Sequence, residues 1–210
     1  MDILEAIDTR KTTRKFGSKK PTIDEVKRMI NSARLAPSAI NAQNWRFISI
    51  FNDDIKNKMA QSVLDKYSEI ISKLDAETGA QVERYKGHST FFTHAPLVIV
   101  CIEKQATSFM GGILEKAGYS ENEIKKMRPD SYLLSMGGAV ENILLTAHSL
   151  GYGSCWMVAP VLGEAGMRKI LNLSDDEKIV SILSIGEIAQ DATDKRSPKK
   201  NLDEIIEIVE

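Results

Sequence analysis

The stretch Ala36-Pro37-Ser38-Ala39-Ile40-Asn41-Ala42-Gln43-Asn44-Trp45-Arg46-Phe47 joins a helix pattern to a strand pattern. Loops in such places often carry functional groups on a rigid scaffold. This one offers a hydroxyl, three amides and backbone groups. Each amide has two donors and an acceptor, which suits the mixed edge of a flavin or a nucleobase. Pro, Ser and Asn are also common turn residues, so the stretch taken alone supports a simple helix stop and turn equally well.

The sequence before this stretch predicts a helix with both ends marked. Thr22 and Glu25 form a capping box, with Thr22 as the N-cap. Pro37 ends the helix, because the residue before a proline is pushed out of the α region. Between them, one face carries apolar residues at helical spacing: Val26, Met29, Ile30 and Ala33.

Periodicity predicts the remaining elements. Helices are predicted over residues 2–9, 53–74, 78–92, 131–150 and 161–171, with the second and third separated around Thr78-Gly79. Strands are predicted over residues 45–51, 97–102, 154–158 and 179–185, and an amphipathic segment over 202–209. Residues 104–130 are predicted to form short, mobile helices that act as a lid. Because helices and strands are mixed without a regular βαβ rhythm, the pattern favours an α+β sandwich with a mixed sheet over a doubly wound fold.

Composition limits the classes of protein to consider. A chain of 210 residues fits one domain, and its formal net charge of -1 gives no general attraction to nucleic acid or acidic membranes. Cys101 and Cys155 lie in apolar runs and are expected to be buried thiols. The first eight residues show no targeting segment, and the longest apolar run, from Ala95 to Ile102, is too short to cross a membrane. A cytoplasmic location is therefore predicted.

Several motifs of other enzyme classes are missing from the sequence. It contains no G-x-G-x-x-G after a strand and no P-loop. The histidines His88, His94 and His148 do not form H-E-x-x-H, so no metal site is predicted. Ser154 does not lie in a G-x-S-x-G elbow. His148, on the most apolar helix, is expected to be a satisfied core or interface histidine.

A basic stretch, Arg10-Lys11-Thr12-Thr13-Arg14-Lys15-Phe16, precedes the first capping box. If the first helix continued through it, Arg10 and Arg14 would project on one side, with threonine hydroxyls between them. Such a set suits a phosphate monoester, because arginine binds phosphate bidentately. The alternative is a solvated basic face. The second basic stretch, from Lys195 to Lys200, could form another wall of the same site.

Five stretches in order carry a resemblance: Arg10 to Phe16, Ala36 to Phe47, Gly138 to Asn142 with Gly151 to Trp156, Gly186-Glu187, and Lys199 to Glu204. Together they resemble the motifs of the nitroreductase family, the FMN-dependent NAD(P)H oxidoreductases. The resemblance runs from residue 3 to about residue 206 and implies a three-layer α+β sandwich with a mixed, mainly antiparallel sheet, in an intertwined homodimer. Lys11 stands where a second arginine is usual, and Asn44 where proline is usual.

The resemblance also implies which residues would bind FMN at two clefts of the dimer interface. Its phosphate and ribityl chain would be held by Arg10, Lys11, Thr12 and Arg14, with Lys199 or Lys200 closing on the phosphate. Residues reaching the flavin of the partner subunit would be Pro37, Ser38, Ala39 and Asn41. The backbone around Trp156, Met157 and Val158 would lie against the ring, with Gly186 and Glu187 near the cofactor.

The implied activity is a two-stage cycle in which NAD(P)H reduces FMN and a nitroaromatic, quinone or similar conjugated acceptor then reoxidises it. Because the flavin carries the chemistry, no catalytic side chain is predicted. Phe109, Met110 and Tyr119 are expected either to line the acceptor pocket or to pack locally within the lid. Two alternatives stay open: another flavin reaction on this fold, such as reductive dehalogenation or flavin fragmentation, and a flavin-binding regulatory protein without turnover.

Overall fold

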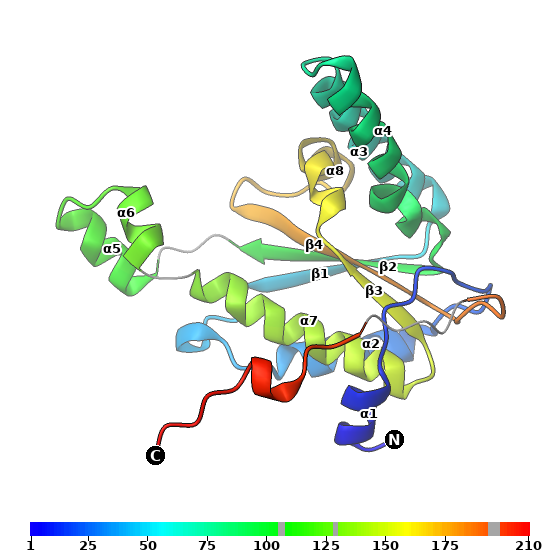
Figure 1. Ribbon diagram of the computed structural model, residues 1–210, viewed down its shortest axis with the longest axis horizontal. Coiled ribbons are helices and arrows are strands. Elements are labelled where there is room, and N and C mark those ends of the chain that lie inside the picture. The colour runs from blue at the N-terminus through cyan, green and yellow to red at the C-terminus, as the bar shows by residue number, and fades with distance from the viewer. Residues whose placement is uncertain (105–107, 128–129, 193–197) are drawn as a thin grey trace.

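The computed structural model describes residues 1–104, 108–127, 130–192 and 198–210. At its centre lies one four-stranded sheet, made of β1 (Trp45–Ile50), β2 (Leu97–Lys104), β3 (Gly153–Met157) and β4 (Glu177–Gly186). The strand order is β1-β2-β4-β3, and every neighbouring pair is antiparallel (Figure 1). Among the described residues, the parallel pairing is a single bridge between Thr12 and Ser154.

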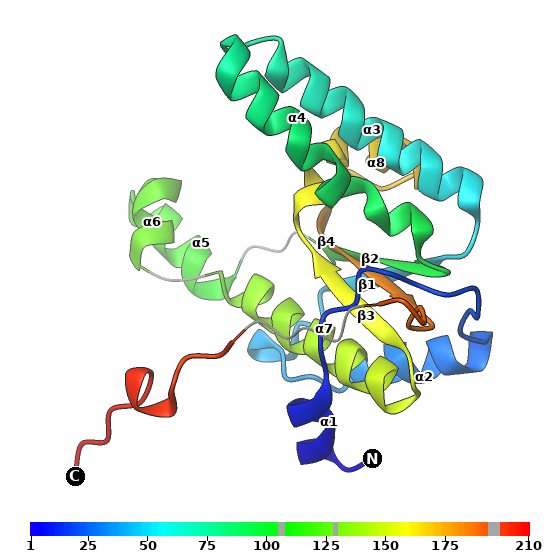
Figure 2. The same ribbon diagram turned by 45° about the vertical axis from the view of Figure 1, so that its right-hand side comes forward.

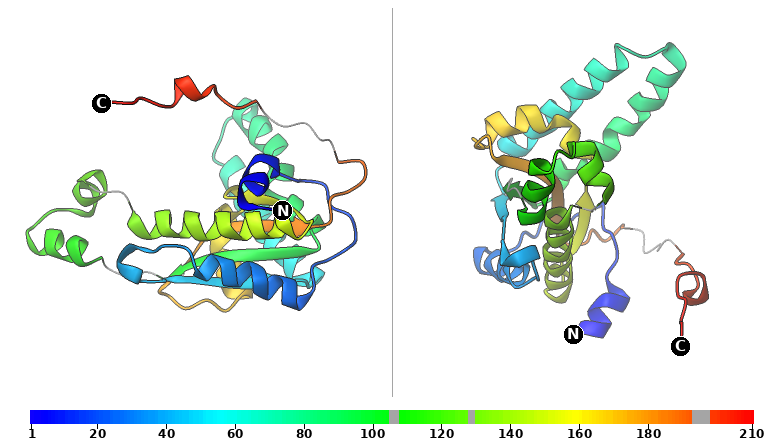
Figure 3. Two further views of the ribbon diagram at one scale, coloured as in Figure 1. Left: turned by 90° about the horizontal axis from the view of Figure 1, so that it is seen from below. Right: turned by 90° about the vertical axis from the view of Figure 1, so that its left-hand side faces the viewer.

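Helices cover both faces of the sheet (Figure 1; Figure 3). On one face lie α2 (Ile23–Arg34) and α7 (Ser131–Ser149), and on the other lie α3 (Asp53–Ile71) and α8 (Glu164–Ile170). Strand β2 is buried on both sides because its side chains alternate between two cores. Leu97, Ile99 and Cys101 face the core with α7, whereas Val98 and Val100 face the core with α3. The predicted three-layer α+β sandwich is therefore confirmed.

The other helices extend this frame. They are α1 (Ile3–Thr9), α4 (Ala76–Thr90), α5 (Phe109–Lys116), α6 (Glu121–Met127) and the short 3₁₀ turns η1 (Ala39–Asn41), η2 (Phe91–His94), η3 (Ala159–Gly163) and η4 (Leu202–Glu204). Helices α3 and α4 form a long hairpin that projects from the sheet, and α5 and α6 form a separate small unit (Figure 2). None of the helices in the described ranges combines the length and apolarity needed to span a bilayer.

Local sequence explains where α2 begins. The Thr22 hydroxyl accepts a hydrogen bond from the Glu25 N–H at 3.2 Å, and the Glu25 carboxylate accepts one from the Thr22 N–H at 2.8 Å. This is the predicted capping box. Glu25 also accepts a 2.9 Å hydrogen bond from the Tyr152 hydroxyl, so the cap is joined to the chain just before β3. These bonds hold the pKa of Glu25 below its usual value, chiefly through the Thr22 backbone.

One sequence prediction about element ends is wrong. The break between α3 and α4 falls at residues 72–75, because Asp75 caps α4 by accepting a 2.9 Å hydrogen bond from the Thr78 N–H. The predicted separator, Thr78-Gly79, lies inside α4. Helix α1 ends at Thr9, where the predicted helix over residues 2–9 ends, and it does not continue into the basic stretch. Over residues 202–209, predicted to be amphipathic, the structure has only the turn η4, and every residue of this segment is exposed.

Candidate functional site

The basic stretch leaves α1 as an extended chain and lies on the edge of β3. Thr12 bridges Ser154, and the Thr13 N–H donates a 2.8 Å hydrogen bond to the Ser154 carbonyl oxygen. Thr13 is buried, and its side chain occupies the space where a Cβ on Gly153 would stand. Glycine at position 153 therefore permits the close approach of the two segments.

The first helix does not continue through Arg10 and Arg14, so helical spacing does not bring them together. Their side chains still share one face of the extended chain. Arg10 has a φ of -59° and a ψ of 134°, outside the helical region. In an extended chain, residues with even spacing share a face, so Arg10, Thr12 and Arg14 alternate with the buried Thr13. The Arg10 guanidinium lies 3.3 Å from the Glu141 carboxylate of α7. Arg14 is exposed and makes no ion pair within the described part of the chain.

The chain after the basic stretch is attached to the end of β4. Phe16 bridges Ile188, and the Gly17 N–H donates a 2.9 Å hydrogen bond to the Glu187 carbonyl oxygen. The Glu187 side chain accepts a 3.1 Å hydrogen bond from the Lys19 N–H. Gly186 is buried, and a Cβ there would meet Pro96 and Phe16. The predicted Gly186-Glu187 pair thus holds the far end of the basic stretch in place.

The polar loop docks on α7 instead of on the basic stretch. The Ala39 N–H donates a 3.1 Å hydrogen bond to the Ser135 hydroxyl, which itself donates to the Ser131 carbonyl oxygen. Within the loop, the Gln43 N–H donates to the Ser38 hydroxyl at 3.2 Å, and the Gln43 amide donates to the Asn41 side chain at 3.1 Å. Pro37 and Asn41 are exposed.

The loop backbone is strained. Ile40, Asn41 and Gln43 have φ values of 51°, 55° and 45°, in the left-handed region that L-residues other than Asn and Gly rarely adopt. A β-branched residue there is uncommon, and Ile40 gains no compensating burial because it is 79% exposed. Strain of this kind is concentrated at ligand-binding sites. A plain turn does not require it.

Strand β3 presents an apolar surface beside α7. Trp156 and Val158 are 43% and 62% exposed, whereas Met157 points into the core, with its sulfur 3.3 Å from the Ser184 hydroxyl. Trp156 passes close to Gly137 of α7: a Cβ on that glycine would stand 3.8 Å from the indole. Of these three predicted residues, Trp156 in β3 and Val158 just after it therefore expose their side chains, whereas Met157 can offer only its backbone.

One thiol and one carboxyl group near these elements have shifted pKa values. Burial raises the pKa of the Cys155 thiol, and the nearby charge of Arg14 acts in the opposite direction. Burial also raises the pKa of Glu103, with a further contribution from the charge of Asp130 at the start of α7. Lys178 and an Asn44 amide donor oppose that rise. Both cysteines are free and buried.

The remaining predicted residues lie elsewhere. Lys199 and Lys200 are exposed at the start of the tail, and neither makes a hydrogen bond or ion pair in the described residues. Lys195 and Arg196 fall outside the described ranges, as do residues 105–107 and 128–129 of the predicted lid. Phe109 and Met110 on α5, and Tyr119 after it, are 74%, 49% and 45% exposed. Within the described ranges, His, Cys, Asp and Glu side chains form no group of three that could hold a metal ion.

Sequence reasoning missed the role of α7. Its side chains contact both regions: Ser135 accepts from the loop, and Glu141 pairs with Arg10 of the basic stretch. His148 lies 2.8 Å from the Thr9 hydroxyl at the end of α1. The adjacent pair Gly137-Gly138 leaves backbone open on the exposed side of the helix. This glycine pair inside an otherwise apolar helix was the signal available in the sequence, since such a pair weakens a helix and needs a packing or functional reason.

The antiparallel sheet enclosed by helices defines the class of the chain as a three-layer α+β sandwich. A model described as "Nitroreductase family" matches residues 7–187. The chain therefore belongs to the nitroreductase family.

Individual proteins agree with this family. MhqN of Bacillus subtilis, named as a candidate NAD(P)H nitroreductase, is 21% identical over 96% of both chains. An iodotyrosine deiodinase of Thermotoga neapolitana is 24% identical, covering 84% of this chain and 83% of that protein. The crystal structure of a BluB-like flavoprotein from Clostridium difficile has a TM-score of 0.89 at 26% identity, covering 100% of both chains. A nitroreductase with bound FMN from Bacteroides fragilis has a TM-score of 0.73 at 20% identity, again over 100% of both.

Proposed function

We propose that the protein is an FMN-dependent oxidoreductase that uses NADH or NADPH to reduce a nitroaromatic, quinone or similar conjugated acceptor. The observation that carries this proposal is the course of the basic stretch, which is fixed along β3 beside the exposed Trp156. One end of this surface is cationic and the other is apolar. FMN has the same two-part character, with a charged phosphate and a flat ring.

The available donors fit this cofactor. Arg14 and Thr12 are exposed, and Arg10 and Lys11 are partly exposed, so charged and hydroxyl donors can reach a phosphate. Trp156 and Val158 supply an apolar surface for the ring, and the nearby Gly137-Gly138 pair leaves room above α7. We assign Lys199 or Lys200 to the same phosphate through movement of the tail. Gly186 and Glu187 support the site by anchoring residues 16–19.

When bound, FMN supplies the redox chemistry, taking up a hydride equivalent from the nicotinamide and passing electrons to the acceptor. The protein's own residues bind and orient. Cationic and amide donors at Arg10, Lys11 or Asn41 would stabilise negative charge on the ring. We further propose that the chain is one domain whose residues 104–130 form a lid, with Phe109, Met110 and Tyr119 facing the acceptor. Their exposure leaves them available for that contact.

We propose that the working unit is a homodimer with one site in each of two clefts. Along α7, the loop docks at Ser135 and the basic stretch at Glu141, about 9 Å apart by helical rise, and α1 contacts His148 further along the helix. A second copy would bring Pro37, Ser38, Ala39 and Asn41 to the first copy's flavin. In support, apolar side chains of α1 and α7 are exposed: Ile3, Leu4, Ile7, Leu133 and Leu134.

Spectroscopy of the purified protein tests this function. The purified protein is expected to be yellow. If it is colourless, added FMN should bind to it at one FMN per chain and give it the yellow colour. Anaerobic addition of NADH or NADPH should bleach the flavin, and an acceptor panel should restore its colour. A colourless protein that FMN cannot reconstitute would overturn the proposal. Bleaching by only one nicotinamide would fix the reductant.

The deiodinase relative favours one second candidate, reductive dehalogenation on the same fold. The acceptor panel should therefore include a halogenated aromatic. Release of halide from it would distinguish reductive dehalogenation from reduction of a nitroaromatic or quinone. Flavin fragmentation would appear as loss of the flavin spectrum that no acceptor restores. Bound FMN that neither nicotinamide bleaches would favour a regulatory flavin-binding protein.

A further inference from the structure

The two arginines of the basic stretch differ in how their side chains are held. Arg14 is exposed, and no ion pair of the described residues includes it. Arg10 lies beside the Glu141 carboxylate of α7, and its side chain is 24% exposed. Between them, the Thr13 N–H bonds to the Ser154 carbonyl oxygen and fixes the backbone of the stretch. Arg10 is therefore the arginine whose guanidinium is tied to a neighbouring element.

The Glu141 carboxylate meets one particular side of the Arg10 guanidinium. Its oxygen lies 3.3 Å from Nε, and in the described ranges Arg10 forms no second ion pair. Nε carries one of the N–H donors of a guanidinium, and the two terminal nitrogens carry the rest. An anion held on the Nε side leaves these terminal nitrogens as a pair that can bind two oxygens of one phosphate. The contact with Glu141 therefore sets the direction of this pair.

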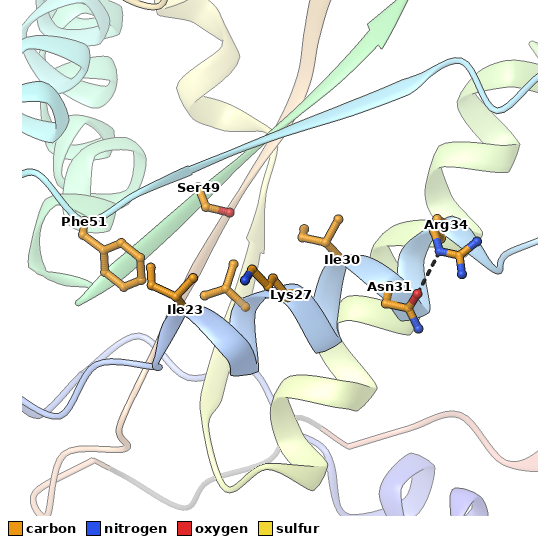
Figure 4. A pocket seen from close by; sticks show the side chains of 8 residues that line it. Ile23, Lys27, Ile30, Asn31, Arg34, Ser49 and Phe51 are labelled. Atoms are coloured by element: carbon orange, nitrogen blue, oxygen red, sulfur yellow. Dashed lines mark hydrogen bonds between the residues drawn. The ribbon is translucent and has the colours of Figure 1, made fainter.

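Another arginine of the chain is held through the same nitrogen. Arg34 lines a groove between α2 and β1, and its Nε donates a 2.8 Å hydrogen bond to the Asn31 side chain (Figure 4). The terminal nitrogens of Arg34 lie on the side away from Asn31 in Figure 4. Both residues belong to α2, so this contact is local. Arg10 is held by a residue of a different element, so its contact also fixes the basic stretch relative to α7.

The position of Glu141 on α7 links this contact to the apolar end of the proposed flavin site. Glu141 lies one helical turn after Gly137, on the same face of α7. A Cβ on Gly137 would stand 3.8 Å from the Trp156 indole. The helix positions that meet Arg10 and Trp156 are thus about 6 Å apart along the helix axis. One face of α7 therefore sets the spacing between the cationic and the apolar ends of the site.

We propose that Glu141 is a positioning residue, which aims the terminal nitrogens of Arg10 at the FMN phosphate. This inference rests on the flavin site proposed above and adds a residue to it. Stability does not explain the pair, because the Glu141 side chain is 43% exposed and ion pairs in water contribute little. Its effect is on affinity. A long side chain that is ordered before the ligand arrives loses less conformational entropy when the ligand binds.

Titrations of the apoprotein with FMN and with riboflavin, which lacks the phosphate, test this role. Glu141→Ala should lower FMN affinity about three- to tenfold, the range for ordering one long side chain, and should leave riboflavin affinity unchanged. The matched control is Glu83→Ala, which removes an ion pair with Lys86 on α4 and should change neither affinity. In an Arg10→Gln background, Glu141→Ala should have no further effect on FMN binding. Urea unfolding of each variant checks that the fold is retained.

If wild type binds FMN, three outcomes would overturn the positioning role. One is an FMN affinity that is unchanged or higher in Glu141→Ala; a higher affinity would mean that the carboxylate competes with the phosphate for Arg10. The second is an equal loss of FMN and riboflavin affinity, which would place Arg10 at the ring. The third is an undiminished effect of Glu141→Ala in the Arg10→Gln background, which would mean that Glu141 acts through another group. A wild type that binds no FMN would overturn the proposed flavin site, and this inference with it.

Discussion

The backbone N–H of Thr13 donates a 2.8 Å hydrogen bond to the carbonyl oxygen of Ser154, and this contact joins the first segment of the chain to the edge strand β3. A Cβ on the neighbouring Gly153 would stand 2.5 Å from the Thr13 hydroxyl oxygen. The position of the basic stretch therefore depends on a glycine more than a hundred residues away in sequence. Thr12 and Arg14 owe their exposure to this attachment, since the buried Thr13 fixes the alternation.

Gly153→Ala is expected to displace the basic stretch. The new methyl would overlap the Thr13 side chain, and overpacking of this kind costs about 1–3 kcal/mol. FMN affinity should fall by about tenfold or more, measured by flavin fluorescence titration. The control is Gly87→Ala in α4, where nothing lies within 4 Å and alanine favours the helix by roughly 0.5–1 kcal/mol. Equal FMN affinity in the two variants would contradict the prediction.

Arg14→Gln should weaken FMN binding without unfolding the protein. A charge-assisted hydrogen bond contributes about 1.5–3 kcal/mol, which corresponds to roughly 10–100-fold in affinity. The matched control is Lys15→Gln. Lys15 forms an exposed ion pair with Asp191 at 2.8 Å, and its substitution should change FMN affinity by less than about threefold. If Lys15→Gln had the larger effect, the phosphate would have been assigned to the wrong face of the stretch.

Trp156 should report cofactor binding directly. It is 43% exposed on β3, next to Gly137, and a ring bound there would quench its fluorescence. Adding FMN to apoprotein is expected to quench the emission in wild type and in Trp45→Phe. In Trp156→Phe most of the quenching should disappear. Quenching that survived in Trp156→Phe and vanished in Trp45→Phe would place the ring on β1 instead.

Glu103→Gln is expected to stabilise the protein at neutral pH. Burial and the charge of Asp130 raise the pKa of Glu103 in the folded state above its unfolded value. Its contribution to stability is therefore complete below the unfolded pKa, near 4.5, and is lost as pH rises through the folded pKa. Removing the charge should raise the free energy of unfolding at pH 7 and change it little at pH 4. Urea unfolding of both proteins at pH 7 and pH 4 measures the difference in free energy of unfolding. A variant less stable than wild type at pH 7 would refute the expected direction of the change.

Phe109→Ala should change acceptor kinetics and leave the fold intact. Phe109 is 74% exposed, so little packing is lost. If it faces the acceptor, KM for bulky aromatic acceptors should rise about three- to tenfold, while anaerobic reduction by the nicotinamide stays the same. Tyr85→Ala, at 54% exposure on α4, provides the matched aromatic control. Unchanged kinetics with every acceptor would leave α5 as a locally packed helix.

Local sequence determined those parts of the fold whose signals need no partner. The Thr22–Glu25 capping box set the start of α2, and the all-apolar run in β2 marked the buried centre of the sheet. The polar residues of the loop before Trp45 were also visible. Capping, burial and turn chemistry depend on residues a few positions apart, so a single sequence contains them.

Only the tertiary structure decided how the site is assembled. The basic stretch follows an extended path along Ser154 and Gly153, and the tail over residues 198–210 is exposed and forms only the turn η4. The polar loop has a strained backbone, and it is joined to α7 through the hydrogen bond between Ala39 and Ser135. These relationships join residues about a hundred positions apart, and their geometry comes from packing two helical layers onto one sheet. The sequence by itself named the groups of the candidate site; tertiary packing decided which of them lie together.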